Sequence, residues 1–104
     1  MSLINVDKNV FDNEIGNSEK TVLLDFYADW CGPCRMLAPT VHEIAEERSD
    51  IVVGKVNCDL SPELAVAFGV VSIPTLIVLR DGKAVAQSVG VRSKADILAM
   101  LENK

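Results

Sequence analysis

The sequence predicts an α/β fold with a central mixed β-sheet and helices on both faces. Strand-like and helix-like segments alternate along the chain in the order βαβαβα-ββα. The run Val22–Ala28 is nearly all apolar, which is typical of a strand covered on both faces. Two later runs, Thr75–Arg80 and Lys83–Val89, flank Asp81-Gly82 and predict an antiparallel hairpin. Crossover connections between the parallel strands distribute the helices over both faces of the sheet.

The first elements of this pattern are a short strand and a helix. Leu3–Val6 is apolar enough for a strand that precedes the central one. Asp7 is a suitable N-cap for a helix over Lys8–Ile15, because its carboxylate accepts from free backbone N–H groups. Gly16 is expected to end that helix.

The middle of the chain predicts a long helix followed by the third strand. Apolar residues recur at helical spacing through Pro33–Glu47 and form a stripe that faces the core. Pro39 removes one interior hydrogen bond and should kink this helix. Ile51–Asn57 follows as a strand.

Two more helices flank the predicted hairpin. Ser61-Pro62 is a strong helix start, because proline suits the first helical turn, and Gly69 ends this short helix. Ser93 and Asp96 resemble a capping box at the start of the last helix, which extends to about Glu102.

Length and composition predict a single domain over residues 1–104. Hydrophobic residues make up 49% of the chain, yet no apolar run approaches the roughly 20 residues that span a bilayer. Ten basic and fifteen acidic residues give a net charge of −5, which disfavours non-specific binding to nucleic acids. The chain starts without a secretory signal, and three cysteines do not suggest a secreted disulfide framework. We expect a monomeric cytoplasmic protein without membrane or nucleic-acid partners.

The most informative stretch is Trp30-Cys31-Gly32-Pro33-Cys34, where the central strand gives way to the long helix. Cysteines three residues apart on a helical turn lie about 5–6 Å from each other and can form a disulfide. A disulfide that closes so small a ring stabilises the fold by only about 2 kcal/mol. It is therefore better suited to reversible redox chemistry than to structural stabilisation. Cys31 sits at the helix start, where free N–H groups stabilise a thiolate, and Cys34 belongs to the core-facing stripe. We therefore expect Cys31 to be exposed and reactive and Cys34 to be shielded and to react second.

Two simpler interpretations of the cysteine pair are half of a zinc site and a purely structural disulfide. Zinc requires four ligands, and the other candidates, Cys58 and His42, do not form a second pair at ligand spacing. We therefore predict no metal site.

At this point the chain resembles the thioredoxin family over nearly its whole length. The landmarks of the resemblance are Asp25 in Leu24–Phe26, the Trp30–Cys34 motif, Pro39, Lys55 in Gly54–Asn57, Ser72-Ile73-Pro74-Thr75 and Val89-Gly90. The resemblance implies a thiol–disulfide oxidoreductase that reduces protein substrates through Cys31 and Cys34. It implies no bound cofactor and a separate thioredoxin reductase, a flavoprotein that uses a nicotinamide donor.

Asp25 is a second unusual feature, because a carboxylate in an apolar central strand is costly unless it is paired or protonated. Burial should raise its pKa, and its expected role is to take the proton of Cys34. The alternative is a carboxylate satisfied by backbone donors. Lys55 on the neighbouring strand is expected either to pair with Asp25 or to leave the sheet edge for solvent.

The resemblance also implies a substrate-docking surface around Pro74. Its peptide bond with Ile73 is expected to be cis and to lie against the cysteine pair, which leaves the Ile73 backbone free to pair with an extended substrate. The expected docking surface comprises Trp30, Gly32, Pro33, Ile73, Pro74, Val89, Gly90 and Val91. Taken singly, Val89 or Val91 is more often a core residue.

Three residues depart from the family pattern. Tyr27 stands where a tryptophan is frequent, Arg35 replaces a lysine, and Cys58 occupies a typically apolar position. Two other functions remain open from the sequence. One is a non-enzymatic subunit or adaptor with the same fold, and the other is an oxidase or isomerase of an oxidising compartment.

Overall fold

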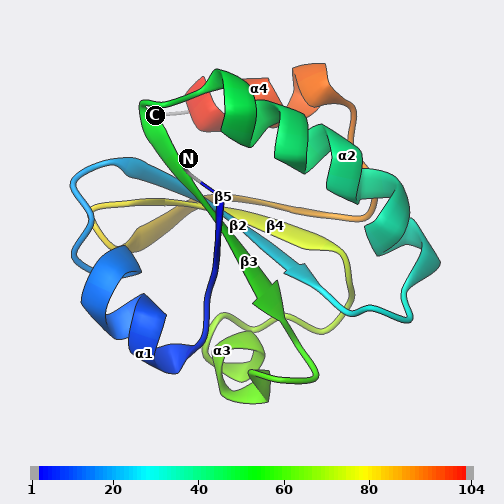
Figure 1. Ribbon diagram of the computed structural model, residues 1–104, viewed down its shortest axis with the longest axis horizontal. Helices are drawn as coiled ribbons and strands as arrows, with labels where there is room; N and C mark the ends of the chain where they lie inside the picture. Colours follow the sequence, from blue (N-terminus) through cyan, green and yellow to red (C-terminus); the bar gives the residue numbers. More distant parts are fainter. Residues whose placement is uncertain (1–2, 103–104) are drawn as a thin grey trace.

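In the computed structural model, which describes residues 3–102, five strands form one mixed sheet in the order β1-β3-β2-β4-β5 (Figure 1). The strands are β1 Leu3–Asn5, β2 Thr21–Tyr27, β3 Ile51–Asn57, β4 Thr75–Arg80 and β5 Lys83–Val89. The first three are parallel to one another. β4 runs antiparallel to β2, and β5 pairs antiparallel with β4. The predicted mixed sheet is confirmed.

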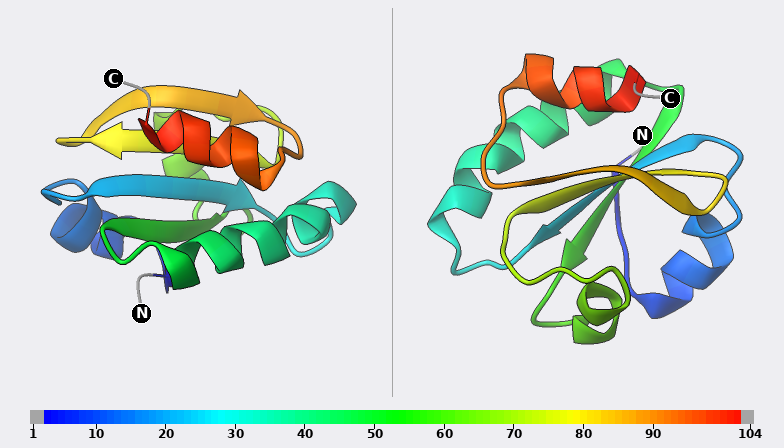
Figure 2. Two further views of the ribbon diagram at one scale, coloured as in Figure 1. Left: turned by 90° about the horizontal axis from the view of Figure 1, so that it is seen from above. Right: turned by 180° about the vertical axis from the view of Figure 1, so that it is seen from behind.

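Helices cover both faces of this sheet, as Figures 1 and 2 show. The helices are α1 Lys8–Val10, η1 Phe11–Ile15, α2 Gly32–Glu47, α3 Pro62–Ala67 and α4 Lys94–Glu102. One core layer joins α2 and α4 to one face through residues such as Leu37, Ile44 and Ile97. A second layer, which includes Phe26, packs α1, η1 and α3 against the other face. Because side chains alternate along β2, this strand contributes residues to both core layers.

The segment after β1 differs from the predicted α-helix over residues 8–15. Asp7 caps it as expected, because its Oδ1 accepts a hydrogen bond from the Val10 N–H at 2.8 Å. After one α-helical turn the chain widens into the π-helix η1, in which the Gly16 N–H bonds to the Phe11 carbonyl at 2.8 Å. Gly16 also ends the helix with a right-handed backbone rather than the left-handed one common for a terminal glycine.

The other boundaries agree with the prediction to within one or two residues. β3, β4 and β5 have the predicted bounds, whereas β1 ends one residue early and β2 is displaced by one residue toward the N-terminus. Ser93 begins the last helix as expected, with its Oγ accepting from the Asp96 N–H at 3.1 Å. The single domain predicted over residues 1–104 includes 1–2 and 103–104, which lie outside the described residues.

Candidate functional site

Cys31 and Cys34 form a disulfide at the N-terminus of α2. Their Cα atoms are 5.2 Å apart, within the range that the i, i+3 spacing predicts. Cys31 is the N-cap residue, and its Sγ accepts a hydrogen bond from the Cys34 N–H at 3.2 Å. A sulfur that carries negative charge would strengthen this bond. The start of α2 is therefore built to favour a thiolate on Cys31.

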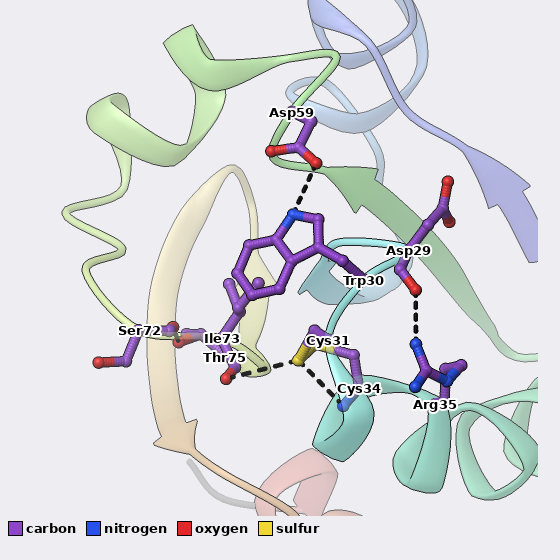
Figure 3. The surroundings of a disulfide bond; sticks show 9 residues. All are labelled: Asp29, Trp30, Cys31, Cys34, Arg35, Asp59, Ser72, Ile73 and Thr75. Carbon is purple, nitrogen blue, oxygen red and sulfur yellow. Dashed lines mark hydrogen bonds between the residues drawn. A yellow bond between two sulfur atoms is a disulfide. The ribbon is translucent and has the colours of Figure 1, made fainter.

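The expectation that Cys31 is exposed is wrong for the disulfide form of the protein. Cys31 and Cys34 are both only 4% exposed, and they pack with buried Ala28 and half-buried Ile73. The loop before β4 covers them, and the Cys31 Sγ lies 3.9 Å from the Ile73 carbonyl oxygen. Figure 3 shows this loop beside the disulfide. Residues more than forty positions away in sequence thus cover the sulfur, which local spacing does not reveal.

The Ile73–Pro74 peptide bond is cis, as the family resemblance implies. The Pro74 carbonyl accepts a hydrogen bond from the Gly90 N–H at 2.8 Å, which brings the end of β5 beside this loop. Within residues 3–102 the Ile73 N–H donates no hydrogen bond. The loop therefore presents a free backbone donor next to the disulfide.

An apolar groove of about 560 Å³ opens beside the Cys31 sulfur. Five residues expected at the docking surface or the disulfide line it, namely Trp30, Cys31, Gly32, Pro33 and Ile73. Its other wall comes from Cys58 and from four residues that were not anticipated, namely Ala65, Val70, Val71 and Ser72. The remaining predicted residues, Pro74, Val89, Gly90 and Val91, lie outside the lining of the groove.

Trp30, Val89 and Val91 are exposed rather than buried in the core. The Trp30 side chain is 69% exposed, although its apolar area would favour burial. Its indole N–H donates to the Asp59 carboxylate at 2.9 Å, which fixes the ring at the mouth of the groove (Figure 3). The Asp59 contact was not anticipated from the sequence.

Asp25 lies in the middle of β2 and is only 1% exposed. Its Oδ1 is buried and accepts no hydrogen bond from the described residues. Burial raises the pKa of Asp25 to about 6, and the positive charge of Lys55 partly opposes this rise. A carboxyl with such a pKa changes its protonation state close to neutral pH. The alternative in which backbone donors satisfy the whole carboxylate does not hold for Oδ1.

Lys55 is the cross-strand neighbour of Asp25 in the β2–β3 register. No ion pair joins these two side chains in the part of the chain that the structure describes. The Lys55 Nζ lies instead 4.3 Å from the centroid of the Tyr27 ring. Lys55 therefore moderates the pKa of Asp25 through its positive charge, but without a direct ion pair, because an aromatic face competes for the ammonium.

A second, smaller cavity of about 150 Å³ reaches Cys34 from the side of β2 and β3. Tyr27, Lys55 and Ala38 line it, together with Ala28, Asp29 and Arg35. The Arg35 guanidinium donates to the Asp29 carbonyl at 2.7 Å and is held at this edge. The two sulfurs therefore adjoin different spaces, with Cys31 at the apolar groove and Cys34 at the smaller cavity, whose lining includes charged residues.

Cys58 is a free, half-buried cysteine that follows β3 and lines the apolar groove. Burial raises the pKa of its thiol, and the carboxylates of Asp59 and Asp25 raise it further. The thiolate of Cys58 is therefore disfavoured, as the adjacent Asp59 suggests from the sequence alone.

Two other properties bear on the predicted classes of function. Among residues 3–102 no three side chains of histidine, cysteine, aspartate or glutamate come together as a metal site would require. No helix in the same range has the length and apolar character needed to cross a lipid bilayer.

Comparison with known proteins places this geometry in a family. The Thioredoxin family model matches residues 2–103. A thioredoxin of Mycobacterium tuberculosis is 48% identical over 96% of this chain and 87% of its own length. A protein of Mycobacterium leprae named bifunctional thioredoxin reductase/thioredoxin is 45% identical over 96% of this chain but only 22% of its own length. The structure of a mutant thioredoxin from Halobacterium salinarum is 37% identical and superposes with a TM-score of 0.88 over 97% of this chain and 88% of its own. The chain therefore belongs to the thioredoxin family, and its Cys31–Cys34 pair makes it a thiol–disulfide oxidoreductase.

Proposed function

We propose that the protein reduces disulfide bonds of protein substrates by cycling between a Cys31–Cys34 dithiol and a Cys31–Cys34 disulfide. The observation that carries this proposal is the asymmetry of the pair. Cys31 borders an apolar groove at a helix N-terminus, whereas Cys34 borders a smaller cavity whose lining includes the charged Asp29, Arg35 and Lys55. This asymmetry supports Cys31 as the sulfur that meets the substrate and Cys34 as the sulfur that loses a proton.

In the first step the Cys31 thiolate attacks one sulfur of a substrate disulfide. A bond forms between Cys31 and that sulfur, the substrate S–S bond breaks, and the other substrate sulfur leaves as a thiolate. The hydrogen bond from the Cys34 N–H and the start of α2 stabilise the attacking anion. Cys31 is therefore the nucleophile.

In the second step Cys34 resolves the mixed disulfide. The Cys34 thiolate attacks the Cys31 sulfur, and the Cys31–Cys34 bond forms. The bond between Cys31 and the substrate sulfur breaks, and that sulfur leaves as a thiolate. Two electrons have then passed from the protein to the substrate. We assign Asp25 as the base that takes the Cys34 proton, because its pKa of about 6 leaves it ionised at neutral pH but not strongly acidic. Lys55 moderates the charge of Asp25.

Substrate docking follows from the free backbone of Ile73 and the apolar groove. An extended substrate segment pairs with the Ile73 N–H as an added strand, which recognises main chain rather than sequence. The residues proposed to contact the substrate are Trp30, Gly32, Pro33, Ile73, Pro74, Val89, Gly90 and Val91.

The cycle also requires a source of electrons. We propose that a separate thioredoxin reductase regenerates the dithiol and that residues 1–104 act as one monomeric domain in the cytoplasm without a bound cofactor. The Mycobacterium leprae relative, whose name combines reductase and thioredoxin, supports the choice of electron donor.

The test is a trapping experiment with insulin as the disulfide substrate. Cys34→Ser should accumulate a covalent complex with an insulin chain, visible by non-reducing electrophoresis and mass spectrometry, because the first attack succeeds and the second cannot occur. Cys31→Ser should neither trap nor reduce insulin. Cys58→Ala is the matched control that removes a thiol outside the pair and should retain insulin reduction. A complex trapped by Cys31→Ser and absent from Cys34→Ser would reverse the two roles.

A further inference from the structure

Tyr27 lies beside Lys55, at the two cavities that both residues line, and on the same strand as Asp25. Its ring centroid is 4.3 Å from the Lys55 Nζ. Both residues line the cavity that reaches Cys34 and also a larger neighbouring cavity of about 530 Å³. Asp25 lies two residues earlier on β2 and points to the same face of the sheet, because side chains alternate along a strand. Lys55 thus has an aromatic ring and a carboxyl as neighbours on β2.

These two neighbours compete for one ammonium group. A lysine ammonium is attracted to the face of an aromatic ring, and it is also attracted to a carboxylate. Its flexible stem allows either position, but a single charge cannot be close to both. The structure contains the first arrangement, since Lys55 lies at the Tyr27 ring while Oδ1 of Asp25 accepts no hydrogen bond from residues 3–102.

We propose that the Tyr27 ring is a positioning group that holds the Lys55 ammonium and thereby leaves the Asp25 carboxyl without a direct cationic partner. The raised pKa of Asp25 agrees with this arrangement, because burial dominates it and Lys55 opposes it only in part. The role given above to Asp25 as a base rests on the proposed function. The positioning by Tyr27 concerns the titration of the carboxyl and is measured without catalysis.

Among the described residues, no other ionisable group near this part of the site acts as a direct cationic partner for Asp25. From α2 and the end of β2, the Arg35 guanidinium is held by the Asp29 carbonyl at 2.7 Å. The charged and titratable groups of the neighbourhood are Asp7, Tyr27, Asp29, Cys34, Arg35, Lys55 and Cys58. On β4 the register partner of Asp25 is Leu76, which does not titrate. Cys34 does not titrate while it is in the disulfide, so in the oxidised protein the Lys55 ammonium is the cation whose position changes in the Tyr27 variants.

The experiment measures the titration midpoint of the Asp25 carboxyl carbon by NMR in the oxidised protein labelled with ¹³C-aspartate. Tyr27→Leu should lower the midpoint by about one pH unit, because the released ammonium approaches the carboxylate. Tyr27→Phe should keep the wild-type midpoint, since it retains the ring. Tyr27→Trp should hold the midpoint at or above the wild-type value, because indole binds cations best.

A double variant separates positioning from a general loss of packing. Lys55→Met alone should raise the midpoint, and adding Tyr27→Leu to Lys55→Met should cause no fall. An unchanged midpoint in Tyr27→Leu, or a fall that persists without Lys55, would overturn the proposal. If Tyr27→Leu does not give a folded NMR spectrum, a midpoint below wild type in Tyr27→Trp would overturn it equally. Insulin reduction at the wild-type rate in variants whose midpoints shift as predicted would count against Asp25 as the base and not against the positioning by Tyr27.

Discussion

Carboxylates near the two ends of α2 lie in opposite environments, one hydrogen-bonded at the surface and the other buried within the sheet. At the C-terminal end, Arg48 bonds both oxygens of Asp50 at 2.8 and 2.9 Å, and Lys94 bridges Glu43 and Glu47. On β2, the strand that precedes the N-terminal end, the Asp25 carboxyl lies buried with an oxygen that has no hydrogen-bond partner among the described residues. The pKa of Asp50 is lowered to about 2 by its hydrogen bonds with Arg48, whereas burial raises that of Asp25 to about 6.

The two carboxylates therefore suit different roles, one in stabilising the fold and the other in proton exchange. A paired carboxylate at the surface keeps its charge over the physiological range and joins neighbouring segments. An unpaired buried carboxylate destabilises the folded protein when it ionises, but it exchanges a proton near neutral pH. Among residues 3–102 the one buried carboxyl is that of Asp25, which lies in the central strand of the sheet.

The largest effect expected from this contrast is on stability after Asp25→Asn. A carboxyl whose pKa is raised in the folded state from 3.8 to about 6 makes folding less favourable as pH climbs through that window. At about 1.4 kcal/mol per pH unit, the wild-type protein should lose about 3 kcal/mol relative to Asp25→Asn between pH 3 and pH 8. Urea unfolding of both oxidised proteins measures this difference. Parallel stability curves would mean that the carboxyl is not buried as described.

Asp50→Asn should show the opposite sign at the other end of α2. Because the folded pKa of Asp50 is depressed, its contribution is present above its ordinary value of 3.8 and is lost as pH falls toward 2. The variant should have a lower Tm than wild type at pH 7 and the same Tm near pH 2. High salt should shrink the difference, because this pair is exposed. A Tm difference that is independent of pH would show that charge pairing is not its source.

The smallest effect on activity is expected from substitution of Cys58, which lies at the same edge of the sheet as the reactive pair. Its raised pKa disfavours the thiolate, so limiting alkylation of the reduced protein at neutral pH should label Cys31 well before Cys58. Peptide mass spectrometry measures the order of labelling, and Cys58→Ala should leave insulin reduction nearly intact. Earlier labelling of Cys58, or a large loss of turnover in Cys58→Ala, would make it a third redox-active thiol.

Much of the fold could be predicted because its strands are marked by local signals. β3, β4 and β5 have the predicted bounds, since apolar runs there end at turn residues such as Asp81 and Gly82. The π-helical turn η1 could not be predicted in the same way. It keeps Ile15 buried much as an α-helix would, so the pattern of apolar residues does not distinguish the two.

Some features of the site could likewise be predicted from local sequence, whereas others depend on residues distant in the chain. The disulfide and the burial of Asp25 follow from spacing and from strand composition, which are local properties. The burial of Cys31 depends on a loop more than forty residues away, and the far wall of the groove comes from Ala65, Val70 and Val71. The choice of Lys55 between a ring and a carboxyl depends on side-chain direction, on which the sequence carries no signal.

The most direct test of the account is the pH dependence with which Cys34 resolves a preformed mixed disulfide between Cys31 and a small peptide. Stopped-flow measurement of peptide release isolates the second step from the first. The release rate of the wild-type protein should rise through an inflection near pH 6, as Asp25 ionises, and Asp25→Asn should lack this inflection. An identical pH profile in both proteins would contradict the assignment of Asp25 as the base for Cys34.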